Sequence, residues 1–171
     1  MQLDEPNLHI VLVRPEIPQN TGSIARLAAA IKARLHLVGP LGFSLEDRYL
    51  KRAGLDYWPL VDLCTYKAWD EFAEQHHDSP RAKSKFFSTH GPTSYLDAHY
   101  KRGDFLFFGG ETSGLGKEFL ADRTDRVYRI PIFEAGVRSL NLSNAVSIVV
   151  YEALRQTGAL RKLRSIRRSK D

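Results

Sequence analysis

The chain has 171 residues, of which 43% are hydrophobic, and its formal net charge is +5. This composition excludes an intrinsically disordered chain and favours one folded domain with a substantial core. No apolar run reaches the ~18 residues that a membrane-spanning helix needs, and the start does not resemble a signal peptide. The single cysteine, Cys64, excludes an internal disulfide and a multi-cysteine zinc site. We therefore expect a cytoplasmic protein without membrane contact.

The positive charge is concentrated at the C-terminus. Residues 159–171 contain six basic residues and one acidic residue, so this segment accounts for the whole net charge. Two interpretations are open: the segment binds a polyanion, or it is a solvated, frayed terminus. We divide the chain into one domain, residues 1–158, and a basic tail, residues 159–171.

Apolar runs alternate with helical patterns along the chain. Residues 8–13 are an apolar run interrupted only by His9, which is typical of a strand buried on both faces. A helix is expected after Gln19, and a second strand at 35–38. This strand–helix–strand order within about thirty residues predicts a parallel βαβ unit.

The middle of the chain gives weaker signals. We expect a helix at 45–54, a strand at 57–63 that Pro59 interrupts, and a helix at 67–77. His76 and His77 are adjacent and point in different directions, so we expect exposure to solvent rather than metal binding.

Clear patterns return in the second half of the chain. Strands are predicted at 85–88, 104–108 and 126–130, and a long helix at 141–156 whose apolar residues recur at three- and four-residue steps. The predicted fold class is α/β, with a mainly parallel sheet flanked by helices.

Three predicted strands end in loops rich in glycine and polar residues, at 20–26, 109–116 and 131–144. Ligands bind outside the carboxyl ends of strands in open parallel sheets. The glycines of any one loop are most simply explained by tight turns, but three such loops together favour a shared site. Neither a dinucleotide fingerprint nor a phosphate-binding loop occurs, which disfavours NAD chemistry and phosphoryl transfer.

Motifs in these three loops resemble those of the SPOUT methyltransferases of the SpoU type. They read P-x-I-P-x-N-T-G-x-I-x-R at 15–26, F-G-x-E-T-x-G-L at 108–115 and R-I-P-I…R-S-L-N-L-S-N-A-V at 129–146. The resemblance extends over residues 8–158. It is strongest to the minimal enzymes that methylate the ribose 2′-hydroxyl of the tRNA wobble nucleotide, cytidine or uridine. It implies a C-terminal trefoil knot, S-adenosylmethionine as cofactor, tRNA as substrate, a homodimer, and no metal.

The resemblance also implies roles for individual residues. The expected catalytic residues are Arg26, Asn20, Glu111 and Asn144. The expected cofactor-binding residues are Phe87, Gly109, Ile130, Ser139 and Leu140. The expected RNA contacts are Arg14, Arg138, His90 and Tyr151. His90 stands where close relatives often have lysine, and Ser113 where they often have arginine, so RNA preference is expected to differ.

Physical reasoning leaves several of these roles open. Arg26 is the family's candidate for activating the 2′-hydroxyl, but a guanidinium pKa above ~12 makes it a poor base. We prefer Arg26 as a group that positions a phosphate or stabilises the developing alkoxide. Asn20 is either a helix N-cap or a substrate contact. Glu111 could order its loop, accept a backbone N–H, or stabilise the sulfonium charge. We expect Gly109 to let the cofactor approach the backbone, so that a bulky residue there would block binding and leave the fold intact.

Other positions leave a choice between core and surface. Tyr151 matches a tyrosine of the family, although an aromatic residue on a helix is more often part of the core. Ile24, Val149 and Val150 would serve a dimer interface as well as a core. The alternative functions are 2′-O-methylation at another RNA site and a non-catalytic RNA-binding knot protein.

Overall fold

A computed structural model describes residues 5–46, 50, 57–77, 79 and 81–161. These residues form a sheet of seven strands in the order β3-β2-β1-β6-β4-β7-β5, and each neighbouring pair is parallel. The prediction of an α/β fold with a mainly parallel sheet is therefore confirmed. The strands are β1 (His9–Val13), β2 (Arg34–Val38), β3 (Asp62–Tyr66), β4 (Ser84–Phe87), β5 (Thr93–Ser94), β6 (Phe105–Gly109) and β7 (Val127–Arg129).

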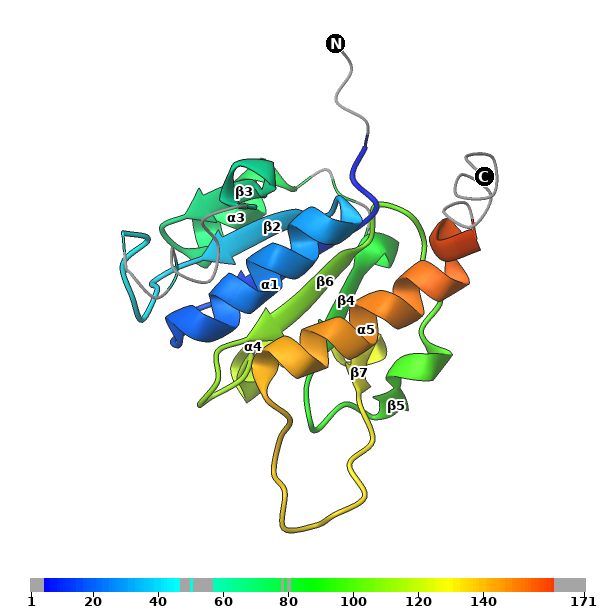
Figure 1. Cartoon of the computed structure of the whole chain (residues 1–171). Helices are drawn as coiled ribbons and strands as arrows, with labels where there is room; N and C mark the ends of the chain where they lie inside the picture. Colours follow the sequence, from blue (N-terminus) through cyan, green and yellow to red (C-terminus); the bar gives the residue numbers. More distant parts are fainter. Residues whose placement is uncertain (1–4, 47–49, 51–56, 78, 80, 162–171) are drawn as a thin grey trace.

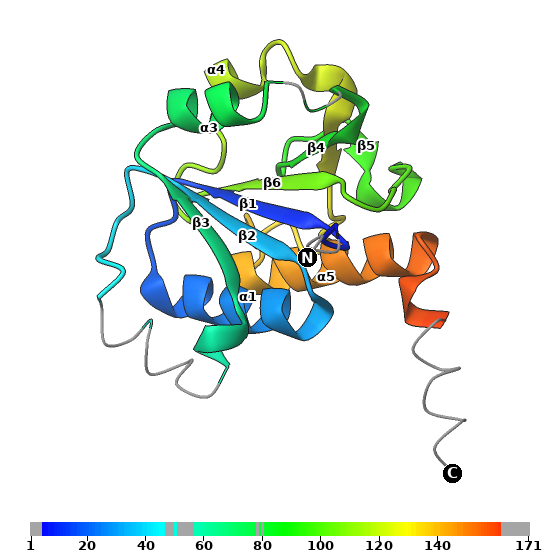
Figure 2. The ribbon, with the colours of Figure 1, turned by 90° about the horizontal axis from the view of Figure 1, so that it is seen from above.

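Helices cover both faces of the sheet (Figures 1 and 2). The two long helices, α1 (Pro18–Ile31) and α5 (Leu142–Gln156), pack against each other on one face. The two short helices, α3 (Trp69–Gln75) and α4 (Lys117–Leu120), lie over the other face. Single 3₁₀ turns complete the described part: η1 (Trp58–Leu60), η2 (Arg81–Lys83), η3 (Tyr95–Asp97) and η4 (Thr124–Arg126).

The predicted first strand lies in the middle of the core, and all five of its residues are buried. Successive side chains of a strand point to opposite faces. Ile10 and Leu12 therefore pack in the layer under α1 and α5, whereas Val11 and Val13 pack under α3 and α4. Each fully buried side chain of this kind contributes about 1.5–3 kcal/mol to folding.

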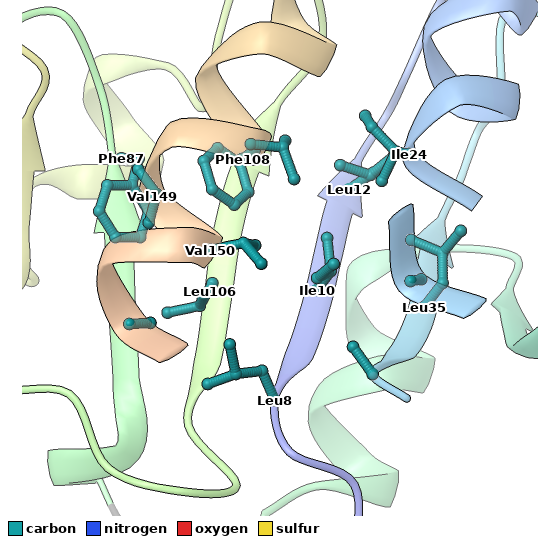
Figure 3. Packing of buried hydrophobic residues seen from close by; sticks show 14 of the residues in the cluster. Leu8, Ile10, Leu12, Ile24, Leu35, Phe87, Leu106, Phe108, Val149 and Val150 are labelled. Carbon is teal, nitrogen blue, oxygen red and sulfur yellow. The ribbon is translucent and has the colours of Figure 1, made fainter. Parts of the chain in front are cut away.

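The packing of the layer under α1 and α5 shows whether Ile24, Val149 and Val150 belong to the core or are free for a dimer interface (Figure 3). Ile24, Val149 and Val150 are all completely buried within the single chain. They contact the β1 and β6 side chains of the same core cluster, among them Leu12 and Phe108. These three residues belong to the core, and an interface between copies would have to use other residues.

The middle of the chain departs from the prediction. The strand expected at 57–63 is wrong: Trp58–Leu60 is a 3₁₀ turn, and the strand begins only at Asp62. Pro59 has no N–H to donate to a strand ladder, which explains why the strand starts beyond it. The helix expected at 45–54 lies largely outside the described residues. The short elements β5 and α4 were not predicted, since two to four residues give no periodic signal.

The C-terminal segment is only partly described. Ala159 and Leu160, which we placed in the basic tail, pack partly buried against the main core. Residues 162–171 lie outside the described residues. The trefoil knot implied by the family resemblance stays a prediction.

A chain of hydrogen-bonded rings lies in the layer under α3. His9 Nδ1 is 2.8 Å from His36 Nε2, His36 Nδ1 is 2.9 Å from the Tyr66 hydroxyl, and that hydroxyl is 3.0 Å from His76 Nε2. The expected exposure of His76 is therefore wrong, because this residue is half-buried at the end of the chain. Burial lowers the pKa of His9 to about 4 and that of His36 to about 2. Both imidazoles are consequently neutral at physiological pH.

Candidate active site

The predicted site lies where neighbouring parallel strands end. β4, β6 and β7 are adjacent, so the residues at their carboxyl ends share one edge of the sheet. Phe87 ends β4 and stacks on Phe108 of β6, with ring centres 4.9 Å apart and an interplanar angle of 14°. Gly109 ends β6, and Ile130 follows β7 directly. Three of the five predicted cofactor residues therefore lie along this edge.

The Glu111 carboxylate joins the loop after β6 to the start of α1. Its Oε2 accepts the backbone N–H of Glu16 at 2.7 Å, and its Oε1 accepts the N–H of Ile17 at 3.1 Å. Oε1 also accepts Nδ2 of Asn20 at 3.0 Å. Of the roles considered for Glu111, acceptance of backbone N–H groups is the one that the structure shows.

Asn20 in turn is hydrogen-bonded to the start of α5. Its Oδ1 accepts Nδ2 of Asn141 at 2.9 Å. Asn141 is the N-cap of α5, because its Oδ1 accepts the backbone N–H of Ser143 at 2.9 Å and that of Asn144 at 3.3 Å. The N-cap interpretation of Asn20 is wrong: α1 begins one turn earlier, with Ile17 at the N-cap position and Pro18 in its first turn. The three motif loops are thus joined by one chain of hydrogen bonds.

The carboxylate of Glu16, just before α1, in turn accepts hydrogen bonds from the loop after β6. Glu16 accepts the backbone N–H of Thr112 at 3.1 Å and the Thr112 hydroxyl at 2.6 Å. These hydrogen bonds lower the pKa of the Glu16 carboxyl. Sequence reasoning missed Glu16, because no local pattern shows which residue 96 positions away will face it.

Gly109 is needed by the fold itself, and its predicted contact with the cofactor stays a prediction. A Cβ at this position would lie 1.9 Å from the carbonyl carbon of Gly114 and 2.2 Å from the backbone nitrogen of Leu115. The close neighbour is therefore the protein's own loop, which folds back with Gly114 N–H donating to Gly110 at 2.9 Å. A bulky residue at position 109 would disturb this loop, so the expectation of an intact fold is wrong.

Arg26 stands apart from the Glu111–Asn20–Asn141 chain. It follows Asn20 by six residues on α1, which places it about a third of a turn away around the helix. Its side chain is exposed, and its guanidinium carbon lies 4.9 Å from the centre of the Tyr57 ring. The structure therefore brings Asn20 and Glu111 together but does not bring Arg26 to them.

The remaining predicted residues are exposed, apart from half-buried Leu140. Ser139 and Asn144 are exposed, and Leu140 is half-buried. The loop between β7 and α5 extends beyond the sheet (Figure 1). All four predicted RNA contacts are exposed: Arg14, Arg138, His90 and Tyr151. Tyr151 is 49% exposed, so its interpretation as a core residue is wrong.

Two hollows of about 270 and 280 Å³ lie away from these strand ends, beside α3 on the face of the sheet that α3 and α4 cover. Both are lined by His76 and Phe105, and none of the predicted cofactor residues lines either of them. We place the candidate site at the strand ends nevertheless, because the converging loops and their hydrogen bonds lie there.

Comparison with known proteins identifies the family of the chain. The sequence model of the SpoU rRNA Methylase family matches residues 7–151. The chain belongs to this family. A tRNA (cytidine(34)-2′-O)-methyltransferase of Burkholderia pseudomallei is 45% identical over 152 residues, which are 88% of this chain and 96% of that protein. A protein of Geobacillus stearothermophilus, provisionally given the same name, is 50% identical over 149 residues, covering 87% of this chain and 94% of its own length.

Solved structures share this fold, and one of them is a SpoU methyltransferase in complex with AdoMet. A structure concerned with 2-OH methylation of C/U34 on tRNA is 46% identical, with a TM-score of 0.80, covering 89% of this chain and 97% of its own. AviRb from Streptomyces viridochromogenes in complex with AdoMet is 25% identical, with a TM-score of 0.74, covering 91% of this chain and 61% of its own. The resemblance drawn from the three motifs is therefore confirmed.

Two further findings concern membranes and metal ions. Among the residues described, no helix is both long and apolar enough to cross a membrane. The same residues contain no cluster of three or more histidine, cysteine or acidic side chains suited to a metal ion.

Proposed function

We propose that this chain transfers a methyl group from S-adenosylmethionine to the ribose 2′-hydroxyl of the wobble nucleotide, cytidine or uridine, of tRNA. The named activity of the Burkholderia pseudomallei relative supports the substrate and the position. The observation that carries the proposal is the hydrogen-bond chain from Glu111 through Asn20 to Asn141, which assembles the three motif loops at one edge of the sheet. A tRNA substrate also implies a cytoplasmic location.

The residues at the strand ends suit this cofactor. When bound, S-adenosylmethionine supplies an electrophilic methyl group on a sulfonium. The half-buried side chains of Ile130 and Leu140 offer apolar surface for its adenosine, and the exposed hydroxyl of Ser139 is available for a polar contact. Phe87 is only 8% exposed, so we expect its backbone rather than its ring to face the cofactor. Pockets of this kind combine mostly apolar walls with a few polar groups.

The chain's own task is to hold the ribose in place and to stabilise the charge that develops on its oxygen. The 2′-oxygen bonds to the methyl carbon as the carbon–sulfur bond breaks, and the hydroxyl proton passes to solvent. We assign the stabilisation of the developing negative charge to Arg26, because a guanidinium stays protonated and presents several N–H donors. Arg14 and Arg138 are exposed and available for backbone phosphates.

We also propose that two copies of the chain associate through the outer surfaces of α1 and α5. Ile17, Ile148 and Tyr151 are 42%, 37% and 49% exposed on or beside these adjacent helices. Burial of such apolar surface favours association. Ile148→Arg should shift the sedimentation of the protein from dimer to monomer. A wild-type protein that sediments as a monomer would contradict this assignment.

The test of the activity is a methylation assay with purified chain, radiolabelled S-adenosylmethionine and tRNA transcripts. A transcript with cytidine or uridine at position 34 should accept one methyl group, and the same transcript with a 2′-deoxynucleotide there should accept none. Arg26→Ala should lower kcat at least 100-fold and leave the cofactor Kd unchanged. Arg26→Lys should fail as well, because a point charge does not replace a planar fork of donors. Equal labelling of the deoxy transcript would overturn the proposal.

A further inference from the structure

The side chain of Tyr57 lies under Arg26. Tyr57 precedes the η1 turn, and its ring centre is 4.9 Å from the Arg26 guanidinium carbon. The Tyr57 hydroxyl also donates to the backbone carbonyl of Gly22 at 3.0 Å. No strand or helix pattern in the sequence indicates this pairing, because the two residues belong to different elements.

The two contacts of Tyr57 are made to one turn of α1. In an α-helix the carbonyl of residue 22 accepts the N–H of residue 26. The hydroxyl of Tyr57 therefore binds the carbonyl that closes the turn carrying Arg26, while its ring faces the guanidinium. One aromatic side chain thus contacts both the helical turn and the charged end of the same arginine.

The contact with Tyr57 restricts the conformations that the Arg26 side chain can adopt. An exposed arginine samples many rotamers, and a residue that stabilises charge in the transition state loses that freedom when it acts. A guanidinium stacked on an aromatic face is restricted before substrate arrives. Burial raises the pKa of the Tyr57 phenol, so the hydroxyl stays protonated and remains a hydrogen-bond donor at neutral pH.

We propose that Tyr57 is a positioning residue that holds Arg26 in its catalytic orientation, with the ring as the main contact and the hydroxyl as a secondary one. This inference rests on the role of Arg26 in the proposed function. Tyr57 itself does not touch the substrate or remove a proton.

The first experiment is a double-mutant cycle with the full chain, measuring kcat, KM for tRNA and cofactor Kd. Tyr57→Leu should lower kcat at least tenfold, with an unchanged cofactor Kd. Tyr57→Phe keeps the ring and should lose no more than roughly fivefold, the equivalent of one neutral hydrogen bond. In an Arg26→Ala background, Tyr57→Leu should cause no further loss of kcat.

A matched control distinguishes this role from a general effect on packing. Leu60 belongs to the same turn and is 73% exposed, so Leu60→Ala should leave all three constants unchanged. Tyr57 also packs against the main core, so Tyr57→Leu is expected to lower Tm in both backgrounds. An equal kcat loss from Tyr57→Leu with and without Arg26 would show that Tyr57 acts through the fold, and would overturn the inference.

The second experiment does not depend on catalysis. Nitrogen-15 relaxation of the Arg26 Nε–H group should show a restricted side chain in the wild type and in Tyr57→Phe, and a mobile one in Tyr57→Leu. The Nε–H group of exposed Arg138 serves as the internal reference. A mobile Arg26 in the wild type would overturn the inference even if tRNA is methylated. Conversely, an ordered Arg26 in a chain that methylates no tRNA would contradict only the proposed function.

Discussion

Asn20 in the first turn of α1 and Asn141 at the start of α5 are joined by a 2.9 Å hydrogen bond, although 121 positions separate them in the sequence. Asn20 is only 7% exposed, and its Nδ2 donates to Glu111 in the loop after β6. One amide side chain therefore connects the two long helices with the strand-end loop. A change at this amide should affect all three motif loops together.

Asn20→Asp tests this connection. The new carboxylate has no N–H for Glu111 and would lie beside another carboxylate, which is unfavourable when both are charged. We expect the free energy of unfolding at pH 7 to fall by about 1–3 kcal/mol, and part of this loss to disappear as pH is lowered toward 4. Urea unfolding at several pH values measures both effects. Asn144→Asp, at an exposed position in the first turn of α5, is the control and should change stability by less than about 0.5 kcal/mol. Equal stability of Asn20→Asp and wild type would show that the amide bridge is dispensable.

Gly109→Ala should destabilise the protein by more than about 2 kcal/mol, because the added methyl group meets the backbone of Gly114 at 1.9 Å. Gly136→Ala is a suitable control, since its Cβ would meet only the flexible Glu134 carboxylate at 3.3 Å. Thermal unfolding of the two variants gives the comparison. A Gly109→Ala protein with the wild-type Tm would contradict the packing of this loop.

The ring chain of His9, His36, Tyr66 and His76 predicts a loss of stability in acid. Both His9 and His36 have folded-state pKa values below the unfolded value of 6.5, about 4 and about 2. The unfolded chain therefore binds more protons below pH 6.5, so their contribution is complete above that pH and is lost as pH falls toward 4 and below. Urea unfolding at pH 7, 6 and 5 should show this decline. His9→Gln should reduce the slope, whereas His99→Gln at an exposed position should leave it unchanged.

Deletion of residues 162–171 should weaken tRNA binding and flatten its salt dependence. The segment carries five basic residues and one acidic residue, and each phosphate that is no longer neutralised reduces the slope of log K against log salt by about 0.7–0.9. The cut is placed after Arg161 because Ala159 and Leu160 pack against the core. Cofactor Kd and Tm should stay the same. An unchanged salt slope would assign the RNA contacts to Arg14, Arg26 and Arg138 instead.

The fold was predictable where local periodicity reflects burial. The run at 8–13 is apolar nearly throughout, and the helix at 141–156 repeats its apolar residues at three- and four-residue steps. The strand and the apolar face of the helix are buried as expected. The meeting of the three loops was also predictable, because parallel strands end at a common edge. The prediction of a strand at 57–63 was wrong, because Pro59 cannot donate a backbone hydrogen bond to a neighbouring strand. The strand begins at Asp62.

The contacts within the site were less accessible to sequence reasoning. The decisive contacts join residues that are far apart in the sequence, so they form only when the chain folds. They are the hydrogen bonds of Glu16 with Thr112 and of Asn20 with Asn141, and the contact of the Tyr57 ring with Arg26. Residue type predicted that these side chains are polar or aromatic, but not which partner each would have. The half-buried position of His76 was missed for the same reason. Its partner Tyr66 comes from β3, and the Tyr66 hydroxyl also contacts His36 on β2.

The central claim is methylation of the wobble ribose, and nucleoside mass spectrometry of cellular tRNA tests it most directly. Position-resolved digests of tRNA should be compared from cells with the gene, without it, and with the gene carrying Arg26→Ala. We predict that 2′-O-methylated cytidine or uridine at position 34 is present in the first, absent in the second and not restored in the third. Unchanged methylation at position 34 after loss of the gene would contradict the account.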